Sequence, residues 1–293
     1  MNVLSLFDGM SCGQLALNRA GIKYSKYFAA EIDKHAIEVT QSNYPDTIQL
    51  GDVNDVGKRR LPKIHLLIGG SPCQGFSFAG KQLNFEDPRS KLFFKFVDYL
   101  RGYRPKYFLL ENVKMKKEYQ DIITQYLGVE PIEINSARVS AQTRKRLYWT
   151  NIPFEKHIKN KGIVLKDILE EKVDEKYYVK KEYDKDLVKH NAKRKDPMSS
   201  YRIYNYGKGA QGNRIYSKDY KSVCLSALGG GRGAKTGLYM IGNRVRRLTP
   251  IECERLQTVP DNYTALASDS QRYKMLGNGW TIDVVAHILR GIQ

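Results

Sequence analysis

The stretch Leu66-Leu67-Ile68-Gly69-Gly70-Ser71-Pro72-Cys73-Gln74-Gly75-Phe76-Ser77 decides how this chain folds. The apolar run that leads into it, residues 64–68, predicts a buried strand. Two glycines then break the strand, and Pro72 fixes its own φ and pushes Ser71 towards an extended conformation. The turn thus presents the thiol of Cys73 just past the carboxyl end of a strand, where open α/β sheets bind their ligands. A free cysteine is more often a small buried hydrophobe, so the rest of the chain must decide.

Strands, glycine turns and helices alternate on both sides of this stretch. Strands are predicted at 2–7, 27–31, 107–110, 131–135 and 147–150, and helices up to residue 20 and at 34–43, 91–101 and 118–127. This rhythm predicts an α/β fold with a doubly wound, mostly parallel sheet of the Rossmann-like kind. The turn at residues 7–13 fits a nucleotide-binding unit, although its glycine spacing is not that of a dinucleotide site. Glu31 and Asp52 each follow a strand. Glu31 is placed to accept hydrogen bonds from ribose hydroxyls, and a helix N-terminal charge is an equally open interpretation.

The places where the alternation of strands and helices stops and resumes also predict the domain boundaries. Residues 1–155 are expected to form a catalytic and cofactor-binding domain, and residues 156–249 a second, smaller domain rich in β-strands and loops. Residues 250–293 are expected to return to the first domain, with Gly277-Asn278-Gly279-Trp280 introducing a last helix at 282–289.

Composition limits the class of protein. The chain has 293 residues, 41% of them hydrophobic, which is enough for a large core, and it contains no apolar run long enough to cross a membrane. No signal peptide is predicted at the start of the chain. The four cysteines lie far apart without metal-site spacing, so we expect no metal, no disulfides and a cytoplasmic location.

Positive charge is concentrated in one part of the chain. The net charge is +18, which favours a polyanionic partner, nucleic acid ahead of a membrane. Residues 201–250 hold ten Lys and Arg against a single acid, together with nine glycines and six tyrosines. Basic, glycine-rich and aromatic sequence is typical of loops that lie on a phosphate backbone. A solvated lysine-rich face is the simpler alternative.

Three predicted strand ends carry reactive groups: the thiol of Cys73, the carboxyl of Glu111 and the guanidinium groups of Arg144 and Arg146. A thiolate near cations and helix N-termini is a good nucleophile. A carboxyl group can protonate a ring nitrogen, and arginine can hold a carbonyl oxygen. Together these groups suit conjugate addition to an electron-poor pyrimidine.

The chain resembles the DNA (cytosine-5) methyltransferases of bacteria and phages. The resemblance runs from Phe7 to Trp280, and four motifs carry it: Pro72-Cys73-Gln74, Glu111-Asn112-Val113, Gln142-x-Arg144-x-Arg146 and Arg247-Leu248-Thr249-Pro250-x-Glu252-Cys253. It implies an S-adenosyl-L-methionine-dependent fold in which residues 156–249 are the target-recognition domain. It also implies that a cytosine is flipped out of duplex DNA at a short GC-containing site. Cys73 would add to C6 of the cytosine, and Glu111 would protonate or hydrogen-bond the ring nitrogen N3. Arg146, supported by Arg144, would hold the carbonyl oxygen O2.

The resemblance also implies the ligand-binding residues. Those for the cofactor are Phe7, Asp8, Gly9, Met10, Glu31, Ile32, Asp52, Val53, Pro72, Leu92, Asn278, Gly279 and Trp280. Those for DNA are Gln74, Ser77, Gln211, Arg214, Tyr216, Ser226, Gly230 and Gly231. Within the loop at 209–217, the glutamine would fill the space left by the flipped base and the arginine would bind guanine. The sequence departs from the family at Ser11, where many members have glycine, at Gly279, where many have serine, and at Cys224, where relatives often have threonine.

Two alternatives stay open: a tRNA cytosine-5 methyltransferase, and a catalytically inactive DNA-binding relative. The presence of Cys73, Glu111 and Arg146 argues against the second. We expect a monomer acting on double-stranded DNA, away from membranes. A partner restriction endonuclease, the full recognition site and the group that removes the C5 proton are left open.

Overall fold

The computed structural model describes residues 1–71, 91–190, 196–208, 210–228 and 232–293. The chain divides into two compact units. The first consists of Met1–Ile134, Lys145–Lys156 and Ile282–Gln293, and the second of Asn135–Arg144 and His157–Thr281. The second unit holds nearly all of the segment 156–249 and extends beyond it at both ends. That segment's role in target recognition stays a prediction.

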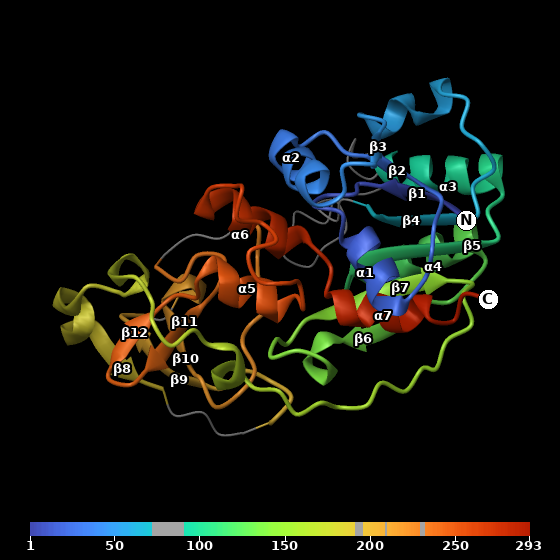
Figure 1. The fold of residues 1–293 in the computed structure, drawn as a ribbon. Coiled ribbons are helices and arrows are strands. Elements are labelled where there is room, and N and C mark those ends of the chain that lie inside the picture. Colours follow the sequence, from blue (N-terminus) through green and yellow to red (C-terminus); the bar gives the residue numbers. More distant parts are fainter. Residues whose placement is uncertain (72–90, 191–195, 209, 229–231) are drawn as a thin grey trace. The chain divides into compact units, whose positions relative to one another are not determined.

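A seven-stranded sheet forms the centre of the first unit, in the order β3-β2-β1-β4-β5-β7-β6 (Figure 1). The strands are β1 Asn2–Leu6, β2 Lys26–Ala30, β3 Ile48–Gln49, β4 Leu66–Gly70, β5 Tyr107–Val113, β6 Ile132–Asn135 and β7 Lys145–Thr150. The five strands β1 to β5 pair in parallel, and β7 runs antiparallel to β5. The predicted doubly wound, mostly parallel sheet is confirmed. Its order reverses between β1 and β4, and ligands bind at such a reversal in open α/β sheets.

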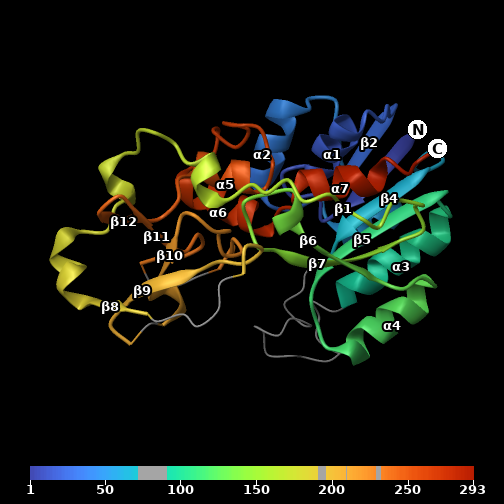
Figure 2. The ribbon, with the colours of Figure 1, turned by 90° about the horizontal axis from the view of Figure 1, so that it is seen from below.

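Helices cover both faces of this sheet, which is why its strands read as continuous apolar runs. They are α1 Cys12–Ala20, α2 Lys34–Asn43, α3 Lys91–Tyr103, α4 Lys117–Leu127 and α7 Ile282–Leu289, with a short 3₁₀ helix η1 at Val53–Lys58. Helices α3 and α4 lie on one face, and α1 and α7 pack together on the other (Figure 2). The core beneath α3 and α4 includes Leu4, Leu6, Leu67, Phe93, Phe96, Phe108, Leu110, Ile123 and Trp149.

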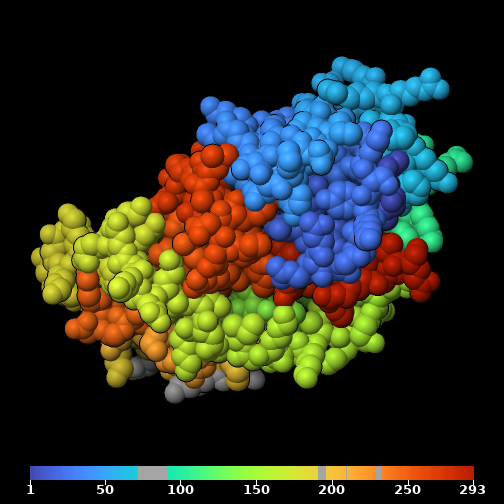
Figure 3. Space-filling model, viewed as in Figure 1, coloured from blue at the N-terminus to red at the C-terminus, as the bar shows by residue number. Residues whose placement is uncertain are grey.

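The second unit contains a five-stranded sheet in the order β12-β11-β10-β9-β8. Its strands are β8 Leu187–Lys189, β9 Arg202–Tyr206, β10 Arg214–Ser217, β11 Leu238–Ile241 and β12 Arg244–Arg246. Its short 3₁₀ helices are η2 Ser136–Arg138, η3 Leu165–Ile168, η4 Glu175–Tyr177, η5 Lys181–Asp186 and η6 Gln211–Asn213. The region of η4 and η5 lies at the surface (yellow in Figure 3). Four buried residues, Tyr206, Ile215, Leu238 and Val245, form the small core of the sheet.

Two further helices complete the second unit, α5 Pro250–Leu256 and α6 Asp269–Asn278. The Thr-Pro-x-Glu sequence that begins α5 is a capping box: the backbone N–H of Glu252 donates to the hydroxyl of Thr249 and that of Thr249 to the carboxylate of Glu252. The expectation that residues 277–280 introduce the last helix was wrong in one respect. Gly277 and Asn278 end α6, and the close packing of Gly277 described below explains the glycine.

Candidate active site

Glu111 and Arg146 form an ion pair at one edge of the first unit. Arg146 lies opposite Val113 in the β5–β7 ladder, two residues from the position opposite Glu111, so the two side chains share one face of the sheet. Arg146 Nε lies 3.0 Å from Glu111 Oε1, and the side chains are only 14% and 10% exposed. The sheet thus holds a carboxylate and a guanidinium together in a largely dry place.

The neighbouring strand delivers the chain to Cys73. Gly70, the last residue of β4, pairs with Glu111. The side-chain amide of Asn112 donates to the hydroxyl of Ser71 at 3.1 Å, and both residues are buried. Ser71 is therefore held beside the Glu111–Arg146 pair. Four predicted site residues follow it, Pro72, Cys73, Gln74 and Ser77, and all four lie outside the described residues.

The turn after β1 is wound in the left-handed region of φ. Phe7 has φ 58°, Gly9 59° and Ser11 61°. L-residues pay roughly 1–2 kcal/mol for this conformation, and glycine does not. The turn explains why a glycine is usual at the position of Ser11, where the hydroxyl accepts a hydrogen bond from Gln14 at 2.9 Å. Apart from the two chain neighbours of Gly9, no atom of the described residues lies within 4 Å of where a Cβ on Gly9 would be, so the space beside the turn is open in that part of the structure.

We expect Ser11→Gly to be more stable than Ser11→Ala by about 1 kcal/mol. Both variants lose the hydroxyl and its hydrogen bond to Gln14, so their difference isolates the backbone strain at φ 61°. The measurement is urea-induced unfolding of the two variants under identical conditions. Equal midpoints and slopes would mean that the turn adapts to a side chain at no cost.

Asp8, in the same turn, is a buried acid. It is 7% exposed, and the hydroxyl of Tyr27 donates to its Oδ1 at 2.7 Å, whereas its buried Oδ2 has no hydrogen-bond partner among the described residues. Burial raises the pKa of Asp8 to about 6, although hydroxyl groups of Ser5, Tyr27 and Ser11 act in the opposite direction. The charge of this turn therefore changes close to neutral pH.

Glu31 ties the first turn to the second strand. Its Oε2 accepts from the backbone N–H of Gly9, and its Oε1 accepts from those of Ile32 and Asp33, each at 2.8 Å. The side-chain cap of α2 is Asp33, and Glu31 lies two residues before it, so the interpretation of Glu31 as a helix N-terminal charge stays a prediction. Ile32 is 73% exposed beside this carboxylate. The carboxylate can accept hydrogen bonds from the hydroxyls of a ribose, and the exposed apolar side chain can pack against an adenine ring.

The other predicted cofactor residues of the first unit differ in accessibility. Asp52 follows β3 and caps η1 by accepting from Asn54 N–H at 2.8 Å. Leu92 lies in the first turn of α3 and is half-buried. Met10 and Val53 are buried at 1% and 6% exposure, so their side chains belong to the core.

Arg144 lies in the second unit, whereas Glu111 and Arg146 lie in the first. It precedes β7 and is 2% exposed. One terminal nitrogen donates to the carbonyl of Leu225 at 3.3 Å, and the other to those of Gly277 and Gly279 at 3.1 and 2.9 Å. Both terminal nitrogens of Arg144 are thus engaged by backbone carbonyls of the second unit, and its support of Arg146 at cytosine O2 stays a prediction.

Two glutamines of the second unit extend this buried cluster and were not predicted as site residues. Gln142 accepts from the backbone N–H of Leu225 at 2.8 Å, and Gln257 donates to the carbonyls of Leu276 and Gly279 at 2.6 and 3.0 Å. Both are fully buried. The only sequence signal was the presence of Gln142 in the Gln-x-Arg-x-Arg motif, since the burial of a polar residue cannot be read from the sequence.

The predicted DNA-reading residues lie in different surroundings within the second unit. Gln211 is exposed at the start of η6, and Arg214 is half-buried at the start of β10. Tyr216 is 8% exposed, and its ring packs beside that of Tyr239, which argues against a DNA contact from this ring. Ser226 is half-buried, and Gly230 and Gly231 lie outside the described residues.

The last three predicted cofactor residues belong to the second unit as well. Asn278 is exposed, Gly279 is half-buried and Trp280 is buried. Within the described residues, no three His, Cys, Asp or Glu side chains gather as metal ligands. No helix in those parts of the chain is both long and apolar enough to cross a membrane.

Comparisons with known proteins give a consistent result. The sequence model of the family "C-5 cytosine-specific DNA methylase" matches residues 1–128 and 131–293. Type II methyltransferase M.HhaI of Haemophilus parahaemolyticus is 31% identical, over 100% of this chain and 94% of the relative. Orphan methyltransferase M.Rho11sI of Bacillus phage rho11s is 31% identical, over 82% of this chain and 60% of the relative. In fold, the chain is similar to the Entamoeba histolytica methyltransferase EhMeth, with TM-score 0.74 and 18% identity over 99% and 97% of the two chains.

Proposed function

The chain belongs to the C-5 cytosine-specific DNA methylase family, and from this premise we propose that it methylates a cytosine rotated out of duplex DNA, through a covalent adduct of Cys73. The enzyme is a DNA (cytosine-5) methyltransferase, and S-adenosyl-L-methionine is its methyl donor. The order of events and the roles of single residues are our proposal. A flipped base is required because C6 of cytosine is out of reach inside the base stack.

The Glu111–Arg146 pair is the observation that carries this proposal. A carboxylate and a guanidinium 3.0 Å apart, beside the strand that leads to Cys73, match the N3 and O2 atoms of cytosine, which are neighbours on one edge of the ring. On binding, Arg146 would turn a donor towards O2, and Glu111 would bring a proton to N3. The ion pair keeps both side chains in place until the base arrives. Once Arg146 has turned to O2, Glu111 takes up a proton from solvent, and as the neutral acid it faces N3.

The reaction then has four steps on the base. The Cys73 thiolate forms a bond to C6 while N3 takes a proton from Glu111, so the ring electrons collect at C5. C5 forms a bond to the methyl carbon of the donor as the bond between that carbon and the sulfonium sulfur breaks, and the demethylated donor leaves as a thioether. A base or water removes the C5 proton, and the electrons of that C–H bond restore the C5–C6 double bond as the thiolate leaves. N3 returns its proton to Glu111, which releases it to solvent as the ion pair with Arg146 forms again, and the enzyme is regenerated.

The residues of the first unit fit the donor. We propose that the carboxylate of Glu31 binds the ribose hydroxyls, that Ile32 covers the adenine and that Asp52 lies at its edge. The open space beside Gly9 leaves room for the methionine portion. A side chain at position 9 would carry backbone strain and would enter this space.

Sequence reading is proposed for the loop around η6. Its exposed Gln211 would enter the stack in place of the flipped base, and Arg214 would bind a guanine at O6 and N7. The loop has a defined shape, because Gly212 accepts from the backbone N–H of Gly233 at 2.7 Å and Asn213 donates to Ala210 at 2.8 Å. Because the loop has a defined shape, Gln211 and Arg214 can carry out different functions, one filling the base stack and the other binding guanine.

We expect Arg214→Ala to weaken binding to the target by about 1–3 kcal/mol and to relax the preference for guanine beside the cytosine. Gln211→Ala should leave this preference unchanged and should slow methylation, because nothing then occupies the gap in the stack. The measurement is the affinity for the target duplex and for its single-base variants at several salt concentrations.

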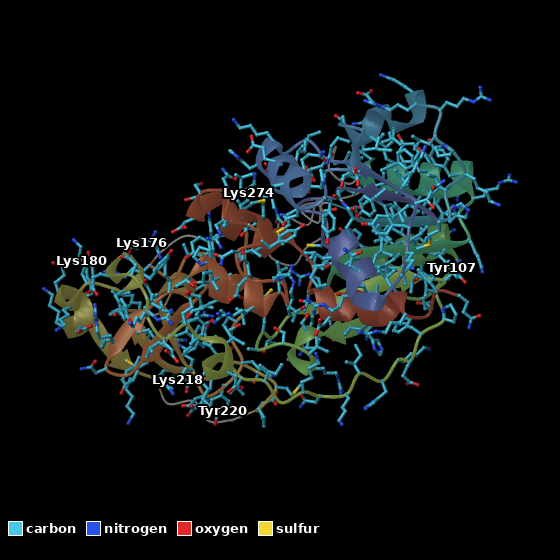
Figure 4. The ribbon with its side chains drawn as sticks, in the orientation of Figure 1. Tyr107, Lys176, Lys180, Lys218, Tyr220 and Lys274 are labelled. Atoms are coloured by element: carbon cyan, nitrogen blue, oxygen red, sulfur yellow. The ribbon has the colours of Figure 1, made fainter. Side chains whose placement is uncertain are left out.

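Lys218→Ala is the control for these variants. Lys218, labelled in Figure 4, is a partly exposed cation in the same unit. As a phosphate contact, it should affect all sequences about equally and lower the salt slope by about one. If Arg214→Ala also weakened every duplex alike, Arg214 would be a backbone contact and the proposed reading of the loop would be wrong.

Bisulfite sequencing tests the proposed function as a whole. Host DNA from cells that express the enzyme should carry 5-methylcytosine at one short motif, and DNA from cells without it should not. The same assay identifies the recognition site. Methyl transfer to duplex DNA and to tRNA, measured side by side, separates the proposed substrate from the RNA alternative. Transfer to tRNA alone would contradict the proposal.

The partners of the enzyme remain proposals too. We propose a monomer, because one protomer carries every predicted catalytic residue, and a cytoplasmic location in a bacterium or a phage-infected host. Relatives named Type II and relatives named orphan methyltransferases both match the chain. These names fit an enzyme with a partner restriction endonuclease and equally one without.

A further inference from the structure

Two segments of the second unit are joined through one buried guanidinium. The first is residues 224–227, which include the predicted DNA contact Ser226, and the second is residues 277–279, which include the predicted cofactor contact Asn278. Arg144 donates to Cys224 Sγ and Leu225 O with one nitrogen, each at 3.3 Å. With the other it donates to Gly277 O and Gly279 O at 3.1 and 2.9 Å.

The two segments also touch directly. A Cβ on Gly277 would lie 2.4 Å from Ala227 N and 2.5 Å from Ser226 C, far inside any normal contact. Only glycine allows the end of α6 to lie against the backbone of Ser226 and Ala227. Two backbones in direct contact cannot approach each other further, so a displacement of residues 224–227 towards residues 277–279 must also displace residues 277–279.

A second pair of side chains runs parallel to Arg144. Gln142 accepts from Leu225 N at 2.8 Å and donates to Gln257 Oε1 at 3.2 Å, and Gln257 in turn donates to Gly279 O at 3.0 Å. These two glutamines are fully buried, as Arg144 is. Breaking such bonds one at a time leaves unsatisfied polar groups without water, so the network favours moving as a whole.

We propose that Arg144 and Gly277 couple DNA recognition to cofactor binding by joining residues 224–227 to residues 277–279. Target DNA that orders the first segment fixes the second, so target DNA and the donor strengthen each other's binding. Arg144 is thus a positioning residue that acts through the segments it joins. The inference rests on the proposed function, in which Ser226 contacts DNA and Asn278 contacts the cofactor.

The test measures a coupling factor, the ratio of the dissociation constants of S-adenosylhomocysteine without and with the target duplex. Wild type should give a factor within the usual allosteric range of about five to 150. Arg144→Met removes the donors, and Gly277→Ala keeps every hydrogen-bonding atom but forces the segments apart. Both should bring the factor to within about twofold of one. Arg144→Lys, which can still reach one or two carbonyls, should give an intermediate value.

Arg138→Met is the matched control. Arg138 lies in the same segment, 135–144, and its guanidinium also donates to a backbone carbonyl, that of Ile158 at 3.1 Å. Its loss should leave the coupling factor at the wild-type value. Thermal unfolding of each variant accompanies the binding measurement. A merely structural Arg144 would lower the midpoint and weaken both binary complexes, and the ratio would not change.

The outcomes are distinct. A wild-type factor near one, or a wild-type factor retained in either Arg144→Met or Gly277→Ala, overturns the coupling. If Arg144→Met does not fold, the coupling factors of Gly277→Ala and Arg144→Lys test the proposal. Failure of the proposed function is recognised separately, because wild type would then methylate no duplex at all.

Discussion

Cys73→Ala is expected to transfer no methyl groups to duplex DNA and still to bind it. The reaction begins with addition of a thiolate to C6, and no other nucleophile of the chain is predicted to replace it. Binding depends on the recognition residues and on the Glu111–Arg146 pair, and the substitution replaces none of these residues. The measurement is single-turnover methyl transfer together with the dissociation constant for the target duplex. A variant that still methylates at a measurable rate would show that Cys73 is not the nucleophile.

A mechanism-based trap separates this result from a folding defect. A duplex with 5-fluorocytosine at the target position should remain covalently attached to the wild-type enzyme, because fluorine cannot leave C5 as a proton does. Peptide mapping of the adduct should identify Cys73. Cys253→Ser is the control, because Cys253 is fully buried and burial raises its thiol pKa well above the usual value. This control should trap the duplex as wild type does.

The strands of the first unit could be predicted from the sequence because each buried strand is an apolar run between turn residues. The predicted strand at 2–7 is β1 at Asn2–Leu6, and the helix predicted at 34–43 is α2. The direction of β7 could not be predicted, since an apolar run carries no sign of parallel or antiparallel pairing. Helices α5 and α6 were also missed. Helix α5 buries the acids Glu252 and Glu254 together with Cys253 and Leu256, so its sequence shows no apolar stripe. Its capping box, Thr249-Pro250-x-Glu252, was the sequence signal that could have found it.

The site was only partly predictable, and the two arginines illustrate why. The resemblance to the family gave Arg144 and Arg146 one shared role at cytosine O2, because both belong to the Gln142-x-Arg144-x-Arg146 motif. Strand β7 begins between them, at Lys145, so Arg146 lies in the sheet of the first unit and Arg144 in the second unit. The sequence did not indicate a structural role for Gly277 either. Its glycine is required by a contact with Ser226 and Ala227, fifty residues away in the sequence, which no local pattern reveals.

Glu111→Gln is expected to slow the chemical step by roughly a hundred- to ten-thousand-fold, the usual contribution of a positioned acid. The amide has almost the shape of the carboxyl group but cannot transfer a proton to N3 while the thiolate adds to C6. The loss is therefore felt in the transition state and hardly in the bound ground state. Single-turnover rates at saturating DNA and donor measure it. The dissociation constants of both ligands should stay within about threefold of wild type.

Glu133→Gln is the matched control for this prediction. Glu133 lies in β6 of the same sheet and forms ion pairs with Lys114 and Lys145 at 2.8 and 3.6 Å, so the substitution removes the same charge from another ion-paired carboxylate. These pairs are partly exposed, and such pairs contribute little to stability. Glu133→Gln should methylate at the wild-type rate. Because Glu111 is the ion-pair partner of Arg146, Glu111→Gln removes the charge that balances a largely buried guanidinium, and a lower unfolding midpoint is expected for this variant alone. If Glu111→Gln retained a single-turnover rate within threefold of wild type, Glu111 would serve only to hold Arg146, and the proton at N3 would come from another source.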